Sequence, residues 1–256
     1  MVLPQIMVAP NGARMQKTDH SAVPITTEEI VACARECFAA GAQSIHAHIR
    51  DKDGTHLLDG SGYRALVNAL HSAVPELAVQ ITTEAAGRYA PDRQMQVALD
   101  SGANHVSVSV REICRATTSD VTTFLDRCAA QNITLQYILY NVDDATRLES
   151  ILPNGALRSP ALQLLFVLGR YGQQDAKPSD LDPFTDWMAH HDLDPDWAVC
   201  AFGKDEVRCL LSAVQKGGKC RTGFENSIHL ADGTIAPNNA AKVSDLRVRL
   251  ALGGKM

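Results

Sequence analysis

Two histidines stand two residues apart in the segment 46–51, which reads HAHIRD. Side chains alternate across a β-strand, so His46 and His48 would point to one face, and Arg50 would share that face if the strand continued that far. Two imidazoles on one face can bind a single divalent cation, as in histidine-rich zinc sites. The alternative is a pair of hydrogen-bonded histidines without a metal, because this spacing alone does not require an ion.

A metal site needs at least a third ligand, and the segment 220–226, CRTGFEN, offers one. Glu225 would complete a His₂Glu set that leaves one position open for water or substrate. Arg221 lies four residues earlier and would face the same cavity. Two alternatives stay open: Glu225 as a solvated loop carboxylate, and Cys220 as a further ligand rather than a buried structural cysteine.

Polar side chains also lie at the ends of other predicted strands. Hydroxyl, amide and guanidinium groups at such positions suit a substrate carboxylate or phosphate, although each one alone also fits ordinary loop chemistry. The substrate contacts that we expect are Asn11, Arg14, Arg50, Thr82, Thr83, Ser107 and Ser109. The seven other histidines show no ligand spacing.

These residues belong to a regular alternation of strands and helices. Apolar or alternating runs predict strands at 5–9, 43–50, 77–82, 104–110, 133–139, 162–168, 197–202 and 219–222. The first helix has a capping box, with Thr26 as N-cap and Glu29 at the third position, and ends at Gly41. Further helices are predicted at 62–73, 92–100, 119–130 (capped by Ser119 or Asp120), 143–152, 182–190, 205–214 and 238–250.

Eight such strand–helix units in succession predict one closed (β/α)₈ TIM barrel over residues 1–256. No composition shift or linker marks a second domain. An open doubly wound sheet is the second choice, but no GxGxxG follows the first strand. In a barrel, the C-terminal ends of the strands carry the active site, so the residues named above are the ones to examine.

The bulk composition excludes several classes. The chain has 256 residues, a net charge of −5 and 45% hydrophobic residues, which rules out a disordered chain, a coiled coil and a small disulfide scaffold. Without clustered Lys and Arg we expect no nucleic-acid partner, and without a long apolar run we expect no membrane span. The seven cysteines lack a CxxC motif and residues 1–10 lack a basic segment, so we expect no signal peptide and a reduced, cytoplasmic location.

Several of these segments together resemble a known family, the β-keto acid cleavage enzymes. They are 8–13 (VAPNGA), 24–29 (PITTEE), 41–42 with 46–51, and 221–226 (RTGFEN), in this order. The resemblance covers nearly the whole chain. Each motif is weak alone, but their combination in this order is specific.

The resemblance implies a zinc-containing (β/α)₈ barrel that acts as an acyltransferase. It would cleave a β-keto acid with acetyl-CoA as co-substrate, giving acetoacetate and a new acyl-CoA. The family's zinc ligands correspond to His46, His48 and Glu225, and its catalytic arginine to Arg221. The hydroxyl that holds the substrate carboxylate corresponds to Thr82, and a second hydroxyl to Ser107 or Ser109. We also expect a homo-oligomer, either a dimer or a tetramer.

Two positions depart from the family pattern. Asn226 stands where members often have an acidic residue paired with the catalytic arginine, and Arg14 stands where the best-known member has a glutamate for a substrate amino group. Arg14 would suit an anionic or neutral substrate instead. A metal-dependent hydrolase is one alternative, although residues 133–139 and 162–168 contain none of the histidines that such enzymes usually add. A non-catalytic barrel that binds a keto acid or thioester is another, supported by Asn226.

Overall fold

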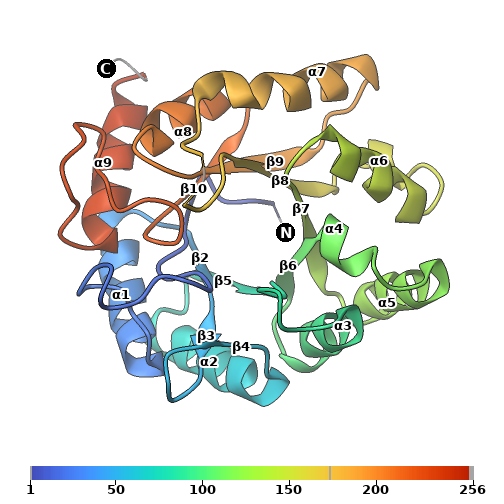
Figure 1. Cartoon of the computed structure of the whole chain (residues 1–256), viewed down its shortest axis with the longest axis horizontal. Coiled ribbons are helices and arrows are strands. Elements are labelled where there is room, and N and C mark those ends of the chain that lie inside the picture. Colours follow the sequence, from blue (N-terminus) through green and yellow to red (C-terminus); the bar gives the residue numbers. More distant parts are fainter. Residues whose placement is uncertain (1, 173, 254–256) are drawn as a thin grey trace.

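Eight parallel strands close into a barrel in this structure, a computed structural model that describes residues 2–172 and 174–253 (Figure 1). Around the barrel the strand order is β1-β10-β9-β8-β7-β6-β5-β2, so the last strand joins the first. The strands are β1 (Ile6–Val8), β2 (Ser44–Ala47), β5 (Ala78–Thr82), β6 (His105–Ser109), β7 (Thr134–Leu139), β8 (Gln163–Leu168), β9 (Asp196–Ala201) and β10 (Lys219–Thr222). The predicted single TIM barrel is confirmed.

Helices surround the barrel and cover its outer face (Figure 1). They are α1 (Thr27–Ala40), α2 (Gly60–Ala73), α3 (Pro91–Asp100), α4 (Val110–Ile113), α5 (Thr118–Ala130), α6 (Val142–Ile151), α7 (Asp182–His190), α8 (Glu206–Gln215) and α9 (Asn239–Ala251), with short 3₁₀ turns η1 (Ala156–Arg158) and η2 (Pro178–Leu181). None of the helices in the described ranges is long and apolar enough to span a membrane.

The hydrophobic core lies mainly between the strands and these helices. Ile45 and Ala47 of β2 point outward into it and are fully buried. Their neighbours point into the barrel, as strand alternation requires. Inside, β8 and β9 contribute a small apolar cluster around Leu165 and Ala198. The facing strands β2, β5 and β6 place histidine, glutamine and serine there instead, so one side of the interior is polar.

The predicted strand over residues 43–50 is shorter in the structure, because the barrel strand ends at Ala47. Asn11 provides the physical reason. Its side-chain oxygen accepts from the backbone N–H of His48 and its amide donates to the carbonyl of the same residue (3.3 and 2.9 Å). The chain then leaves the barrel as β3 (Ile49–Arg50), which pairs antiparallel with β4 (His56–Leu57). Arg50 therefore lies beyond the barrel wall.

Two smaller differences concern the segment after β6. The predicted strand over 104–110 ends at Ser109, and Val110 opens the short helix α4. Helix α5 is capped by Thr117 rather than by Ser119 or Asp120, because the Thr117 hydroxyl accepts from the backbone N–H of Asp120 (3.2 Å). A hydroxyl three residues before the donor is the usual geometry of an N-cap.

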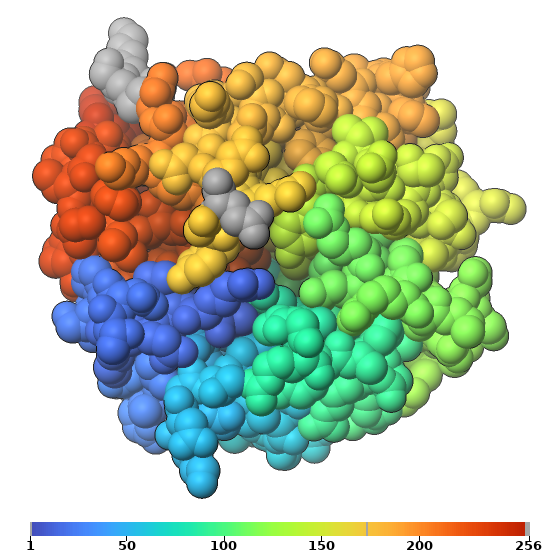
Figure 2. All heavy atoms as spheres, viewed as in Figure 1, coloured from blue at the N-terminus to red at the C-terminus, as the bar shows by residue number. Residues whose placement is uncertain are grey.

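Two loops approach each other over one end of the barrel. The loop after β1 brings Arg14 above the ring of Tyr171, with 5.6 Å between the guanidinium carbon and the ring centroid. Tyr171 belongs to the loop after β8, and its hydroxyl lies 3.5 Å from the sulfur of Met15. Figure 2 shows these two segments, blue and yellow, meeting near the centre of the visible face. They form part of the entrance to the site described next.

Candidate metal centre and active site

His46, His48 and Glu225 meet at the C-terminal ends of β2 and β10, on either side of β1. Their ligand atoms form a nearly equilateral triangle. His46 Nε2 and His48 Nε2 lie 3.1 Å apart, and Glu225 Oε2 lies 3.7 and 3.6 Å from them. Tetrahedral zinc with bonds of about 2.0–2.2 Å holds its ligand atoms about 3.3–3.6 Å apart. The triangle therefore has the size that a zinc-like ion requires, and these three residues form a candidate metal site.

The chemistry of the three donors also suits a cation. Burial, reinforced by the charge of Arg221, holds the pKa of His46 well below its usual range, and burial next to His46 does the same for His48. Both imidazoles are therefore neutral, which is the state that binds a metal. Glu225 Oε2 is buried and has no hydrogen-bond partner among the described residues. Such an orphaned oxygen costs free energy unless a ligand or ion satisfies it.

Glycine at position 12 allows Glu225 to take this position. Gly12 has a φ of +57° in the left-handed region, and a Cβ placed there would lie 2.5 Å from Cγ of Glu225. A second glycine, Gly223, lies so close to Ala9 that a Cβ would overlap the Ala9 carbonyl oxygen. Glycine is therefore required at both positions, because any larger residue would collide with Glu225 or with the backbone of Ala9.

Arg221 is buried directly beside the candidate metal site. Its Nη2 donates to Glu225 Oε1 at 3.1 Å and lies 3.3 Å from the sulfur of Cys200. Glu225 thus presents one carboxylate oxygen to the histidines and the other to the guanidinium. The Nε and Nη1 atoms of Arg221 are buried without partners in the described part of the chain. These donors are therefore available to a ligand oxygen beside the candidate metal site.

A buried ion pair holds the strand and loop that carry Arg221 and Glu225. Glu206 accepts from the Thr222 hydroxyl and the Gly223 backbone N–H (3.1 and 3.3 Å), and it pairs with Lys242. Lys242 also donates to the carbonyl of His229, on the far side of the loop (2.7 Å). Both charged side chains are almost completely buried. The sequence alone does not predict this pair, because its two residues lie on different helices and no local pattern links them.

Two predicted substrate contacts have positioning roles here. Asn11 is fully buried and binds the backbone of His48, as described above, and the carbonyl of Pro24 (3.0 Å). Arg50 donates to the carbonyls of Gly12, Met15 and Gly54. Both side chains therefore hold the loop after β1 against the end of β2. Direct contact of either with substrate stays a prediction.

The four predicted hydroxyl residues divide into two pairs. Thr82 Oγ1 accepts from the backbone N–H of Glu84, and Thr83, on the opposite face of the strand, donates to the carbonyl of Ser107 (2.9 Å each). The hydroxyls of Ser107 and Ser109 are buried inside the barrel and have no partner among the described residues. Of these four hydroxyls, those of Ser107 and Ser109 are therefore unpartnered in the described part of the chain, whereas those of Thr82 and Thr83 are hydrogen-bonded to the backbone.

Glu84 directly follows Thr82 and Thr83 and lies beside the candidate metal ligands, although the sequence alone assigned it no role. One of its carboxylate oxygens lies 4.0 Å from His48 Nδ1. Burial, with the neighbouring charge of Glu225, raises the pKa of Glu84 to about 7. A small cavity of about 40 Å³ joins Glu84 to Arg14, Tyr171 and Glu225.

A larger cavity of about 210 Å³ continues from Glu225 toward solvent. Its walls come from the loops after β8, β9 and β10 and include Phe202, His229 and Asn226. Neither polar atom of the Asn226 side chain has a partner in the described part of the chain. The Asn226 amide is therefore free to bind a ligand beside Glu225.

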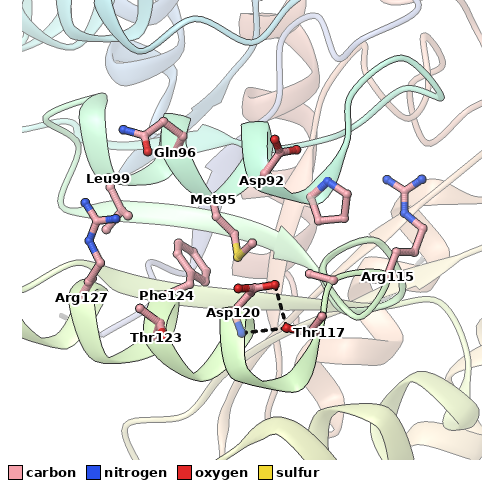
Figure 3. Close-up of a pocket in the computed structure, with 12 residues that line it drawn as sticks. Asp92, Met95, Gln96, Leu99, Arg115, Thr117, Asp120, Thr123, Phe124 and Arg127 are labelled. Carbon is pink, nitrogen blue, oxygen red and sulfur yellow. Dashed lines mark hydrogen bonds between the residues drawn. The ribbon is translucent and has the colours of Figure 1, made fainter.

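A more spacious groove lies elsewhere, and none of the candidate metal ligands found among the described residues lines it. It measures about 500 Å³ and runs between α3 and α5 on the outside of the barrel (Figure 3). Met95 and Phe124 face each other in it, and Asp120 is hydrogen-bonded to Thr117 (2.7 Å). The C-terminal strand ends, where TIM barrels carry their active sites, and the candidate metal ligands lie at a different place, so this groove is not the candidate active site.

Comparison with known proteins finds a family, and relatives within it, that this chain resembles. The family model for beta-keto acid cleavage enzyme matches residues 5–253. The chain is 27% identical over 253 residues to a 3-oxoadipate:acetyl-CoA acetyltransferase of Cupriavidus necator, covering 94% of this chain and 86% of the relative. It is also 27% identical over 251 residues to a 3-keto-5-aminohexanoate cleavage enzyme of Acetoanaerobium sticklandii, covering 94% and 88%.

Solved structures of similar fold include ObcA bound to oxaloacetate, with a TM-score of 0.66 and 14% identity. That match covers 92% of this chain but only 65% of ObcA. A type I 3-dehydroquinate dehydratase from Clostridium difficile follows, with a TM-score of 0.63, 10% identity and coverage of 100% and 94%. These likenesses show the barrel fold alone. The family match over nearly the full length shows more: the chain belongs to the β-keto acid cleavage enzyme family.

Proposed function

We propose that this chain is a zinc-dependent enzyme that cleaves a β-keto acid with acetyl-CoA, releasing acetoacetate and a new acyl-CoA. The observation that carries the proposal is the triangle of His46, His48 and Glu225, with the unused donors of Arg221 directly beside it. Relatives named for acetyl-CoA-dependent transfer support the reactants. We further propose that residues 1–256 act as one catalytic domain within a cytoplasmic homo-oligomer.

The residues divide the chemistry between them. Zinc bound at this site would act as a Lewis acid on the keto and carboxylate oxygens of the substrate. Arg221 keeps its proton under ordinary conditions, so its role is to orient the substrate and to stabilise the enolate or oxyanion that develops. We propose that Thr82, Ser107 and Ser109 supply hydroxyl groups for the carboxylate, since the hydroxyls of Ser107 and Ser109 are buried without a partner among the described residues.

Charge at the entrance limits the substrate class. Arg14 lines the cavity that leads to Glu225, and its guanidinium lies above Tyr171. A cation at this position repels a substrate ammonium group and attracts a carboxylate. We therefore propose a β-keto acid whose distal end is anionic or neutral.

A three-substrate assay tests the class and the substrate together. Purified protein is incubated with acetyl-CoA and, in turn, 3-oxoadipate, 3-oxohexanoate or 3-keto-5-aminohexanoate, which carry a distal carboxylate, no charge or an amine. We expect acetoacetate and acyl-CoA from the first two and little from the third. In Arg14→Glu the order should reverse. Hydrolysis without transfer to CoA would indicate a hydrolase, and binding without turnover would indicate a non-catalytic barrel.

Metal analysis tests the cofactor separately. The protein should hold about one zinc per chain, and His46→Ala should lose it. His71→Ala is a suitable control, because His71 lies on α2 and is exposed, outside the group of candidate ligands. A wild-type chain that takes up no divalent metal from a zinc-containing buffer would overturn the ligand assignment.

A further inference from the structure

The barrel interior below the candidate metal site contains a buried layer of two glutamines and a histidine that the proposed chemistry does not use. Gln80, His105 and Gln136 come from β5, β6 and β7 and are at most 1% exposed. Such layers usually consist of branched apolar side chains. Buried amides cost free energy unless every polar atom is paired, so their presence calls for an explanation.

Hydrogen bonds join these side chains into a line that starts at the backbone and ends at His46. Gln136 Nε2 donates to the carbonyl of Leu164 at 3.2 Å. Gln80 Nε2 donates to Gln136 Oε1 and to Nε2 of His105, both at 2.9 Å. Gln80 Oε1 lies 2.7 Å from Nδ1 of His46.

The direction of every bond in this line follows from its first member. A backbone carbonyl can only accept, so Gln136 must turn its NH₂ group toward Leu164 and its oxygen toward Gln80. Gln80 must then donate to Gln136, which leaves its own oxygen facing His46. An amide oxygen can only accept, so His46 must carry its proton on Nδ1. The lone pair of His46 then lies on Nε2, the atom that faces His48 and Glu225.

We infer that Gln80 is a positioning residue that selects the tautomer of His46 able to bind the metal through Nε2, and that Gln136 acts through Gln80. This inference rests on the proposed zinc site. The hydrogen bond to the second ring nitrogen of a metal-binding histidine fixes both its tautomer and its ring orientation. The register supports it, because His46 and Gln80 are directly paired across β2 and β5.

Zinc affinity, measured by competition with a chelator, tests the inference without any activity assay. Gln80→Leu keeps the volume but removes the acceptor, so affinity should fall about 10- to 100-fold. Gln80→Glu restores an acceptor for His46 Nδ1 and should recover most of the loss. Gln136→Leu should weaken binding less, and in the Gln80→Leu background it should add nothing. Gln94→Leu is the matched control: Gln94 is fully buried and hydrogen-bonded to Thr83, yet it does not reach the ligands.

Each outcome has one meaning. A wild-type chain that binds no zinc would overturn the proposed function. Wild-type affinity in Gln80→Leu would overturn only the positioning role, and equal losses from Gln136→Leu in both backgrounds would overturn the line through Gln80. Should the variants fail to fold, long-range ¹H–¹⁵N spectra of metal-free wild-type protein still report the His46 tautomer. We expect protonated Nδ1, and protonated Nε2 would contradict the inference.

Discussion

The substitution Gly12→Ala tests whether Gly12 holds Glu225 in the position that binds zinc. Its effect on zinc affinity can be measured separately from its effect on the stability of the fold. A Cβ at Gly12 would lie 2.5 Å from Cγ of Glu225, whereas ordinary contact needs at least about 3.4 Å. The carboxylate of Glu225 must therefore move by about 0.9 Å. Metal sites tolerate deviations of about 0.2 Å in ligand distance, so Gly12→Ala should weaken zinc binding at least tenfold.

A control substitution measures the contribution of backbone strain to the effect of Gly12→Ala. Gly12 has a φ of +57°, which costs a residue with a side chain about 1–2 kcal/mol. Gly217→Ala serves as the control, because Gly217 has a φ of +90° and no described atom lies within 4 Å of its added Cβ. Both variants should lose a similar amount of stability from strain, measured by urea unfolding of the metal-free protein.

Only Gly12→Ala should lose zinc affinity in chelator competition. If Gly12→Ala binds zinc as tightly as Gly217→Ala does, then Glu225 either is not a ligand or is not held in place by Gly12. That result would refute the reasoning that connects the loop after β1 to the metal.

Three further predictions concern charged and titratable groups. Arg221→Ala should reduce kcat about 100- to 1,000-fold while zinc stays bound, measured by acetoacetate release and metal analysis; a loss below tenfold would remove Arg221 from the mechanism. Lys242→Met leaves the Glu206 carboxyl buried without its partner and should destabilise the fold by about 3–5 kcal/mol in urea unfolding, a loss that adding Glu206→Gln should partly reverse. Burial lowers the pKa of His105 to about 4, so between pH 6.5 and 4 the unfolded chain binds more protons than the folded one. The contribution of His105 to the free energy of unfolding is therefore fully present above pH 6.5. It should fall by up to about 1.4 kcal/mol per pH unit as the pH drops toward 4. The substitution His105→Gln should reduce this slope in urea unfolding measured over the same pH range.

Local patterns in the sequence predicted the elements and the candidate metal ligands. The capping box of Thr26 and Glu29 and the left-handed end at Gly41 are both present in the structure. The interval between His46 and His48 places both rings on one face of a strand, because strand alternation has a period of two. Closure of eight units also places the end of the last strand beside the first, which brings Glu225 within reach.

Only the tertiary structure decided which polar side chains face the cavity and which are hydrogen-bonded to other parts of the chain. Asn11 and Arg50 bind backbone carbonyls of loops that are distant in sequence, so they end β2 and shape the entrance. Gln80 and Gln136 have ordinary positions in strands, and only the barrel register joins them to His46. Strand alternation says which face a side chain occupies but not which partner it meets, because the partner is set by strand order and register. The candidate ligands could therefore be predicted from the sequence, whereas the hydrogen bonds that orient them could not.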